Sequence, residues 1–173
     1  IVIEGIGGHA ELAPNAWYAG GPVDAVQLTR QMLDGLDILN RRWMHDPRKN
    51  HPLMAMPNQI IITQLNVGEH PSSMAGRGEI VIDVQYLPHE KDEFGLGGHV
   101  KREIEAHVAA VCLADPYLKE HPARVEWILD ADCAEVPADH PFVESFQGAV
   151  AAARLDPALS GFGAHSDIGL PTG

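Results

Sequence analysis

Hydrophobic patterns of two different periods alternate along this chain, and their order limits the folds that it can adopt. Runs of β-branched or alternating apolar residues predict strands, and apolar residues spaced three and four apart predict helices. The strands are expected over residues 1–4, 58–67, 79–87 and 123–131, and the helices over residues 22–44 and 94–113. This β-α-β-β-α-β order is the ferredoxin-like arrangement, an antiparallel sheet with both helices on one face. We therefore predict an α+β, ferredoxin-like sandwich for residues 1–132.

The same patterns assign a buried face to each element. Pro22 suits the first turn of the first helix, because its missing N–H would be unpaired there in any case. In the strand over residues 79–87, Ile80, Ile82 and Val84 share one face. The helix residues expected to face the core are Val23, Val26, Leu33, Leu36, Ile38 and Leu39 in the first helix, and Val100, Ile104, Val108 and Val111 in the second.

Residues 133–173 are surplus to a ferredoxin-like unit. They contain a third helix pattern, for which Asp139 is the expected N-cap and Pro141 lies in the first turn. The sequence ends shortly after the glycine-rich stretch SGFGAHSD, and it begins directly in a strand pattern without a methionine. We expect this segment to belong to a second domain and the chain to be a piece of a longer enzyme.

Charge and composition exclude several classes of partner. The chain has 24 acidic and 12 basic residues, a net charge of -12, and no stripe of Lys or Arg that could follow a phosphate backbone. We therefore predict no nucleic-acid partner. No apolar run approaches the roughly 20 residues that a membrane span requires, so no membrane partner is expected either. Cys112 and Cys133 form no CxxC motif, which favours reduced thiols and the cytoplasm.

Ten histidines raise the question of a metal site, but their spacing does not support one. The sequence contains no HxH, no HExxH and no pair of histidines four apart on one helix face. Six of the histidines lie beside proline, aspartate or other loop signals, and we interpret them as solvated loop residues. These are His45, His51, His70, His89, His121 and His140.

Two short polar stretches carry possible chemistry. His9 follows Gly5, Gly7 and Gly8, which allow tight or positive-φ backbone, so its imidazole can project from a loop and donate a hydrogen bond to a developing oxyanion. The second stretch, GAHSD, places His165, Ser166 and Asp167 behind small residues, where proton transfer, hydrogen bonding and binding of a cation are all open to them. An Asx or ST turn that caps the next element is the alternative for this stretch.

Taken together, these features resemble the M20 family of metallohydrolases, which includes acetylornithine deacetylase, succinyl-diaminopimelate desuccinylase, aminoacylases and metal-dependent carboxypeptidases. The resemblance rests on a strand that leads into G-x-x-x-H at residues 5–9, on the β-α-β-β-α-β order, and on the Gly-rich HSD loop near residue 166. It covers the whole chain. Residues 1–132 correspond to the lid, or dimerisation, domain, and residues 133–173 to the return of the chain into the zinc-dependent catalytic domain.

The resemblance implies roles for particular residues. His9 would be catalytic, reaching the active site of the partner subunit of a homodimer and polarising the scissile carbonyl, while Ser166 and Asp167 would line the substrate pocket. The parent enzyme would use two zinc ions. In this family the metal ligands and the general-base glutamate lie outside the lid, so no metal ligand is predicted in this chain, and the chain alone is expected to be inactive.

Two departures from the family pattern concern the substrate. Residues 72–75 read SSMA where many members have N-x-I-P, which makes Ser72 a substrate-binding candidate. Gln85 stands where a strand arginine often holds a substrate carboxylate, and an amide cannot supply that charge. Arg77 is the nearby arginine that could take over this role.

The sequence thus predicts the lid portion of an M20-type amide hydrolase, acting on an N-acyl amino acid or a small peptide. A stand-alone ferredoxin-like module that binds a small molecule or regulates another protein is the alternative, because fold alone does not determine function. A third possibility is a self-contained metalloenzyme in which His9, His165 and Asp167 converge on one chain.

Overall fold

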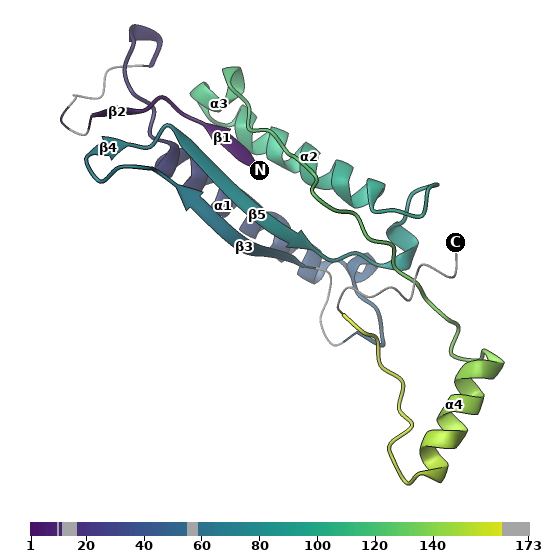
Figure 1. Cartoon of the computed structure of the whole chain (residues 1–173). Helices are drawn as coiled ribbons and strands as arrows, with labels where there is room; N and C mark the ends of the chain where they lie inside the picture. Colours follow the sequence, from purple (N-terminus) through teal and green to yellow (C-terminus); the bar gives the residue numbers. More distant parts are fainter. Residues whose placement is uncertain (10, 12–16, 55–58, 164–173) are drawn as a thin grey trace.

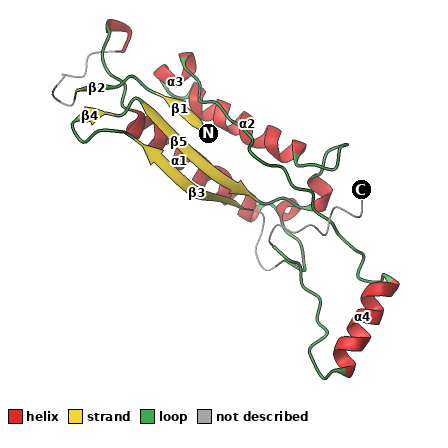
Figure 2. Cartoon of the chain, in the orientation of Figure 1, coloured by secondary structure: helices red, strands yellow, loops and turns green. Residues whose placement is uncertain are grey.

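A small antiparallel sheet forms the centre of the molecule. The computed structural model describes residues 1–9, 11, 17–54 and 59–163 (Figure 1). Three strands pair in the order β1-β5-β3, and a separate two-stranded ribbon joins β2 to β4 at one end (Figure 2). The strands are β1 (Val2–Glu4), β2 (Gly8–His9), β3 (Ile60–Val67), β4 (Ser73–Met74) and β5 (Arg77–Val84). Strand β5 is central and pairs antiparallel with both neighbours.

Two long helices supply most of the remaining core. The α-helices are α1 (Ala25–His45), α2 (Gly98–Leu113), α3 (Pro116–Glu120) and α4 (Pro141–Ala152), and the short 3-10 helices are η1 (Trp17–Ala19), η2 (Pro47–Lys49) and η3 (Pro88–Glu90). Helix α1 packs against the sheet, and α2 packs against α1. Their buried side chains form one hydrophobic cluster with those of β1 and β5. Within the described residues, no helix is both long and apolar enough to cross a membrane. The predicted α+β class is confirmed.

The fourth strand that the pattern predicts over residues 123–131 does not form. Only one bridge, between Val2 and Arg124, joins this segment to β1. Side chains hold the segment instead, since Tyr86 donates to the Ala131 carbonyl (2.6 Å) and Lys101 pairs with Asp130 (2.7 Å). The complete ferredoxin-like sheet is therefore not confirmed.

The environment of Tyr86 shows how firmly this segment is held. Burial raises the pKa of the Tyr86 phenol, and the nearby carboxylate of Asp130 raises it further. Lys91 adds a hydrogen bond from its ammonium group to the Cys133 carbonyl (2.9 Å). Polar side chains thus replace strand pairing as the attachment of residues 130–133.

Two helix starts differ from the prediction. Helix α1 is capped by Asp24, whose Oδ1 accepts from the Val26 N–H (3.0 Å), so Pro22 lies before the cap and not in the first turn. Val23 is likewise outside the helix, in a bridge with Ile6. Helix α4 is capped by the His140 ring and not by Asp139, although Pro141 does lie in its first turn.

The predicted core faces are confirmed for α2 and β5 but only partly for α1. Val100, Ile104 and Val108 are buried and Val111 is partly buried, as expected. Ile80 is buried, and Ile82 and Val84 pack against the core. In α1, Leu36 and Leu39 are buried, whereas Val26 and Ile38 are both 46% exposed. The true face also uses Leu28, Thr29, Met32 and Trp43. The buried residues follow one helical stripe from Ala25 to Trp43, and Val26 and Ile38 lie on either side of it.

A buried ammonium group links η2 to two other elements. Lys49 is 7% exposed, and its Nζ lies 2.5 Å from Oε1 of Glu90 and 2.7 Å from Oε2 of Glu103. The indole N–H of Trp43 donates to the other Glu103 oxygen (2.7 Å), and Lys49 also lies over the Trp43 ring. Burying a lysine is favourable only with such partners. The network ties the C-terminal end of α1 to α2 and η3.

Helix α1 lies directly on β5 at Gly78. A Cβ placed on Gly78 would meet the Thr29 hydroxyl, which is itself buried. Gly35 allows a similar approach between the helices, since its Cβ would lie 2.5 Å from a methyl group of Val111. Glycine at these positions is required by close packing and not by a positive φ.

We predict that Gly78→Ala destabilises the protein by about 1–3 kcal/mol, the usual cost of inserting a methyl group into a packed core. Thr29→Ala in the same chain should recover part of the loss by making room. Gly148→Ala is the control, because a Cβ there meets nothing within 4 Å. Urea unfolding followed by circular dichroism measures the differences, and equal effects of the two glycine substitutions would contradict the packing argument.

Candidate functional site

The glycines before His9 are explained by backbone packing. A Cβ on Gly5 would meet the Val23 carbonyl oxygen, and the Gly5 N–H donates to the Gly76 carbonyl (2.8 Å). A Cβ on Gly76 would lie 3.2 Å from the nitrogen of Gly7. Neither Gly5 nor Gly7 has a positive φ. The glycines therefore allow the tight backbone that the sequence predicts, and they carry the chain from β1 to His9 against β4.

His9 lies in β2, directly opposite Ser73 of β4. Its side chain is 57% exposed, and its Nδ1 accepts a hydrogen bond from the Glu11 N–H (3.3 Å). The Glu11 carboxylate is farther from the same nitrogen, at 3.9 Å, so the backbone donor determines the tautomer. In the neutral ring the proton must then lie on Nε2. His9 thus carries its N–H donor on a side chain that is more than half exposed.

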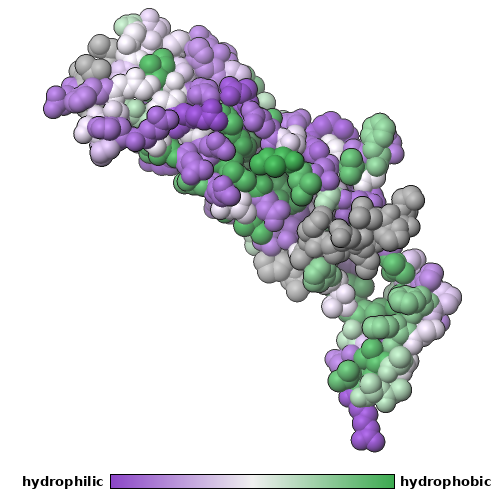
Figure 3. Space-filling view, in the orientation of Figure 1, coloured by the Kyte–Doolittle hydropathy of each residue, from purple (hydrophilic) through white to green (hydrophobic). Residues whose placement is uncertain are grey.

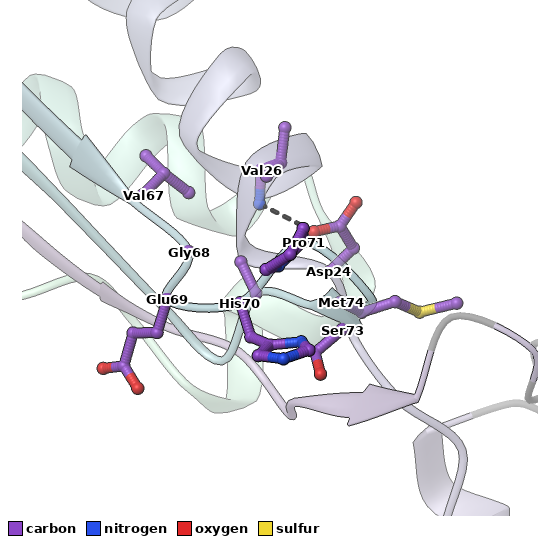
Figure 4. A pocket seen from close by; sticks show the side chains of 10 residues that line it. Asp24, Val26, Val67, Gly68, Glu69, His70, Pro71, Ser73 and Met74 are labelled. Atoms are coloured by element: carbon purple, nitrogen blue, oxygen red, sulfur yellow. Dashed lines mark hydrogen bonds between the residues drawn. The ribbon is translucent and has the colours of Figure 1, made fainter.

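An open pocket of about 470 Å³ adjoins the β2–β4 ribbon (Figure 4). It is formed by the start of α1 and by the turn between β3 and β4, and its polar side chains are Asp24, Glu69, His70 and Ser73. Because Ser73 is directly opposite His9, the two side chains lie on the same face of the ribbon. The pocket and His9 are therefore neighbours at one end of the molecule.

Ser72 lies at this same end, in the turn that leads into β4. It is exposed, and its backbone N–H donates to Nδ1 of His70 (3.1 Å). His51 and His140 accept in the same way from the N–H groups of Leu53 and Phe142. Three of the histidines predicted to be solvated loop residues therefore have a structural role as caps of turns and of α4.

Gln85 lies at the opposite end of the sheet from His9. It follows the last residue of β5, and this eight-residue strand spans roughly 23 Å at about 3.3 Å per residue. Its Nε2 donates to the Gly163 carbonyl (3.1 Å). Arg77 is at the His9 end and is paired with Glu4 (3.3 Å) and Glu79 (3.4 Å). The structure therefore does not bring Arg77 to the position of Gln85.

The remaining candidates, His165, Ser166 and Asp167, lie outside the described residues. Gly163, the last described residue, lies at the Gln85 end of the sheet, opposite His9. Among the described residues, no three His, Cys, Asp or Glu side chains gather closely enough to hold a metal ion. The described part of the chain therefore does not fit a zinc site.

Sequence reasoning missed Asp24, Glu69 and His70 as neighbours of His9. The sequence could have identified Asp24 as the residue at the start of the first helix, because an aspartate just before a helical pattern is a common N-cap. The other two lie in a turn between strands, and only the pairing of β2 with β4 brings that turn beside His9. No spacing along the sequence indicates this pairing.

No protein-family profile matches this chain. The chain is 31% identical over 125 residues to N-formyl-4-amino-5-aminomethyl-2-methylpyrimidine deformylase of Halalkalibacterium halodurans, which corresponds to 69% of this chain and 27% of that protein. Its fold matches the crystal structure of aminopeptidase PepT from Bacillus cereus, with a TM-score of 0.57 and 18% identity over 99% of this chain and 39% of that one. The chain thus spans between about a quarter and two fifths of the proteins that it matches.

We predict that the neutral His9 ring carries its proton on Nε2. Nitrogen-15 NMR of the imidazole, at a pH where the ring is neutral, should show Nδ1 in its unprotonated form. His51 and His70 are internal references, because their Nδ1 atoms accept the same kind of hydrogen bond. Protonated Nδ1 at His9 alone would mean that the Glu11 N–H does not control the tautomer.

Proposed function

We propose that this chain is the lid portion of a longer M20-type enzyme that hydrolyses the amide bond of an N-acyl compound. The observation that carries the proposal is the 31% identity with a deformylase over 125 residues. The fold shared with an aminopeptidase over 99% of the chain supports the same assignment, because both of these proteins are named for cleaving an amide bond. The position and tautomer of His9 agree with it.

For the substrate, we propose an N-formyl or other N-acyl derivative of an amine. The deformylase is named for removing a formyl group from an aminomethylpyrimidine. Gln85 carries no charge and already donates to Gly163, so it provides no charged partner for a substrate carboxylate. An N-acyl amino acid, as in the deacetylase and desuccinylase types, therefore fits this position less well. A small peptide is the second candidate, which the fold shared with the aminopeptidase favours.

In this proposal His9 acts as a hydrogen-bond donor and not as a general base. Its Nε2–H would donate to the carbonyl oxygen of the scissile amide and stabilise the negative charge that develops there. The distance between His9 and Gln85 suggests that the two residues do not serve one active site from the same chain. His9 would therefore reach the active site of a partner subunit, which requires a homodimer.

Strand β3 is suited to form that homodimer. It is at the edge of the sheet, it is eight residues long, and it exposes Ile61, Ile62 and Leu65 by 37–49%. A long apolar edge strand pairs readily with a second copy about a two-fold axis. Pairing along β3 would join the sheets of two subunits.

Residues 133–173 would continue into the catalytic domain. Helix α4 extends away from the sheet and has no buried residue (Figure 1). Phe142 and Phe146 on this helix stack on each other and are 68% and 62% exposed. Such an apolar helix needs a further surface to cover it. This feature favours the lid of a larger enzyme over a stand-alone binding or regulatory module.

The proposed enzyme would use the two zinc ions that the family resemblance implies, and bound zinc would supply an activated water. Among the described residues, no three His, Cys, Asp or Glu side chains lie close enough together to bind a metal ion. Both ions would therefore be held by other parts of the enzyme. This chain would then contribute His9, the pocket beside it and the dimer contact. The self-contained metalloenzyme would require His9 to meet His165 and Asp167. Gly163, the last described residue before them, lies at the opposite end of the sheet from His9.

We predict that His9→Ala, in the enzyme that contains this chain, lowers kcat by about 10²–10³ and changes KM much less, because the lost donor acts on developing charge. His99→Ala is the matched control, an exposed histidine on α2. Steady-state assays with N-formyl and N-acetyl amines and with di- and tripeptides would separate the candidate substrates. Full activity of His9→Ala would exclude the proposed role.

We also predict that Leu65→Lys on β3 weakens dimerisation by at least tenfold, because two like charges would meet near the two-fold axis. Leu113→Lys, at a 67% exposed leucine at the end of α2, should leave it unchanged. Analytical ultracentrifugation of the chain over a range of concentrations measures both. A dimer that tolerates Leu65→Lys would show that β3 is not the contact.

A further inference from the structure

Three segments that are distant in sequence meet at the end of the sheet opposite His9. They are Gln85 after β5, the turn over residues 51–54, and residues 161–163. The Gln85 side chain donates to the Gly163 carbonyl (3.1 Å), and the Gly161 N–H donates to the Leu53 carbonyl (2.6 Å). The second hydrogen bond joins residues 108 positions apart, so tertiary structure alone creates it.

The 51–54 turn is a firm support for this contact. Nδ1 of His51 accepts from the Leu53 N–H (3.2 Å), and the His51 carbonyl accepts from the Met54 N–H (3.0 Å). A Cβ on Gly161 would meet the Met54 sulfur, and a Cβ on Gly163 would lie 3.2 Å from its terminal methyl. The returning chain therefore lies directly against Met54.

Gln85 is equally well fixed. Its backbone N–H donates to the Gln59 carbonyl (3.2 Å), which extends the pairing of β5 with β3 by one step. The side chain is half-buried. By contrast, no residue from Glu135 to Gly163 is buried, so few contacts restrain the returning chain. A single hydrogen bond from a rigid strand end matters most where other contacts are few.

We propose that Gln85 is a positioning residue. It holds the Gly163 carbonyl and so fixes residues 161–163 of the returning chain at this end of the sheet. Any effect on substrate selection rests on the function proposed above, whereas the structural role does not. Gln85 acts through the backbone of the return segment and does not bind substrate itself. An amide suits this role, because it donates an N–H without placing a charge beside the loop.

Hydrogen exchange of the Gly161 amide tests the proposal in the chain as it stands. In Gln85→Leu, which removes the donor, exchange at Gly161 should be about 2- to 10-fold faster, the range that one neutral hydrogen bond contributes. Gln85→Glu is of the same size and also lacks the donor, so it should act alike even if Leu disturbs folding. Gln85→Arg retains N–H donors and should keep the protection.

Gln64→Leu is the matched control, a glutamine on the exposed strand β3, and should leave Gly161 unchanged. Protection of β5 amides reports whether each variant is folded. Unchanged exchange at Gly161 in folded Gln85→Leu and Gln85→Glu would overturn the proposal. So would equal loss of protection in Gln85→Arg. None of these outcomes involves turnover, so a failure here is distinct from a failure of the proposed amide hydrolysis.

Discussion

Contact between α1 and the central strand β5 is the interaction on which the rest of the structure depends. It is close because Gly78 has no side chain and lets the helix lie on the strand at Thr29. Asp24 caps the start of the helix by accepting a hydrogen bond from the Val26 N–H. β5 in turn pairs with β1 and β3, and its two ends lead to the β2–β4 ribbon and to Gln85. A shift of α1 would therefore move both ends of β5.

The length of β5 separates two groups of polar residues. At one end are His9, Ser72 and the pocket with Asp24 and His70. At the other, Gln85 holds the chain that leads toward Ser166 and Asp167. Side chains separated by the length of a strand cannot act on one small molecule. The proposed homodimer resolves this, because a two-fold axis can bring opposite ends of two sheets to one active site.

Prediction from the sequence succeeded where a pattern is local. The alternation in β5 and the helical spacing of Val100, Ile104 and Val108 identify their buried faces correctly, because each side chain's direction follows from the backbone period. It failed over residues 123–131, which have a strand pattern. A strand needs a partner edge, and Arg124 alone in this segment is bridged to β1, at Val2. The alternation of a segment contains no information on its partner.

The sequence by itself determined the α+β class, the two long helices, the strands over β3 and β5 and the candidacy of His9, because periodicity and glycine spacing are properties of neighbouring residues. Only the tertiary structure decided that the glycines serve packing against Val23 and Gly76. It also decided that Gln85 binds the backbone of Gly163. These outcomes depend on atoms that folding brings together from distant positions or turns toward each other, and no spacing along the chain encodes their geometry.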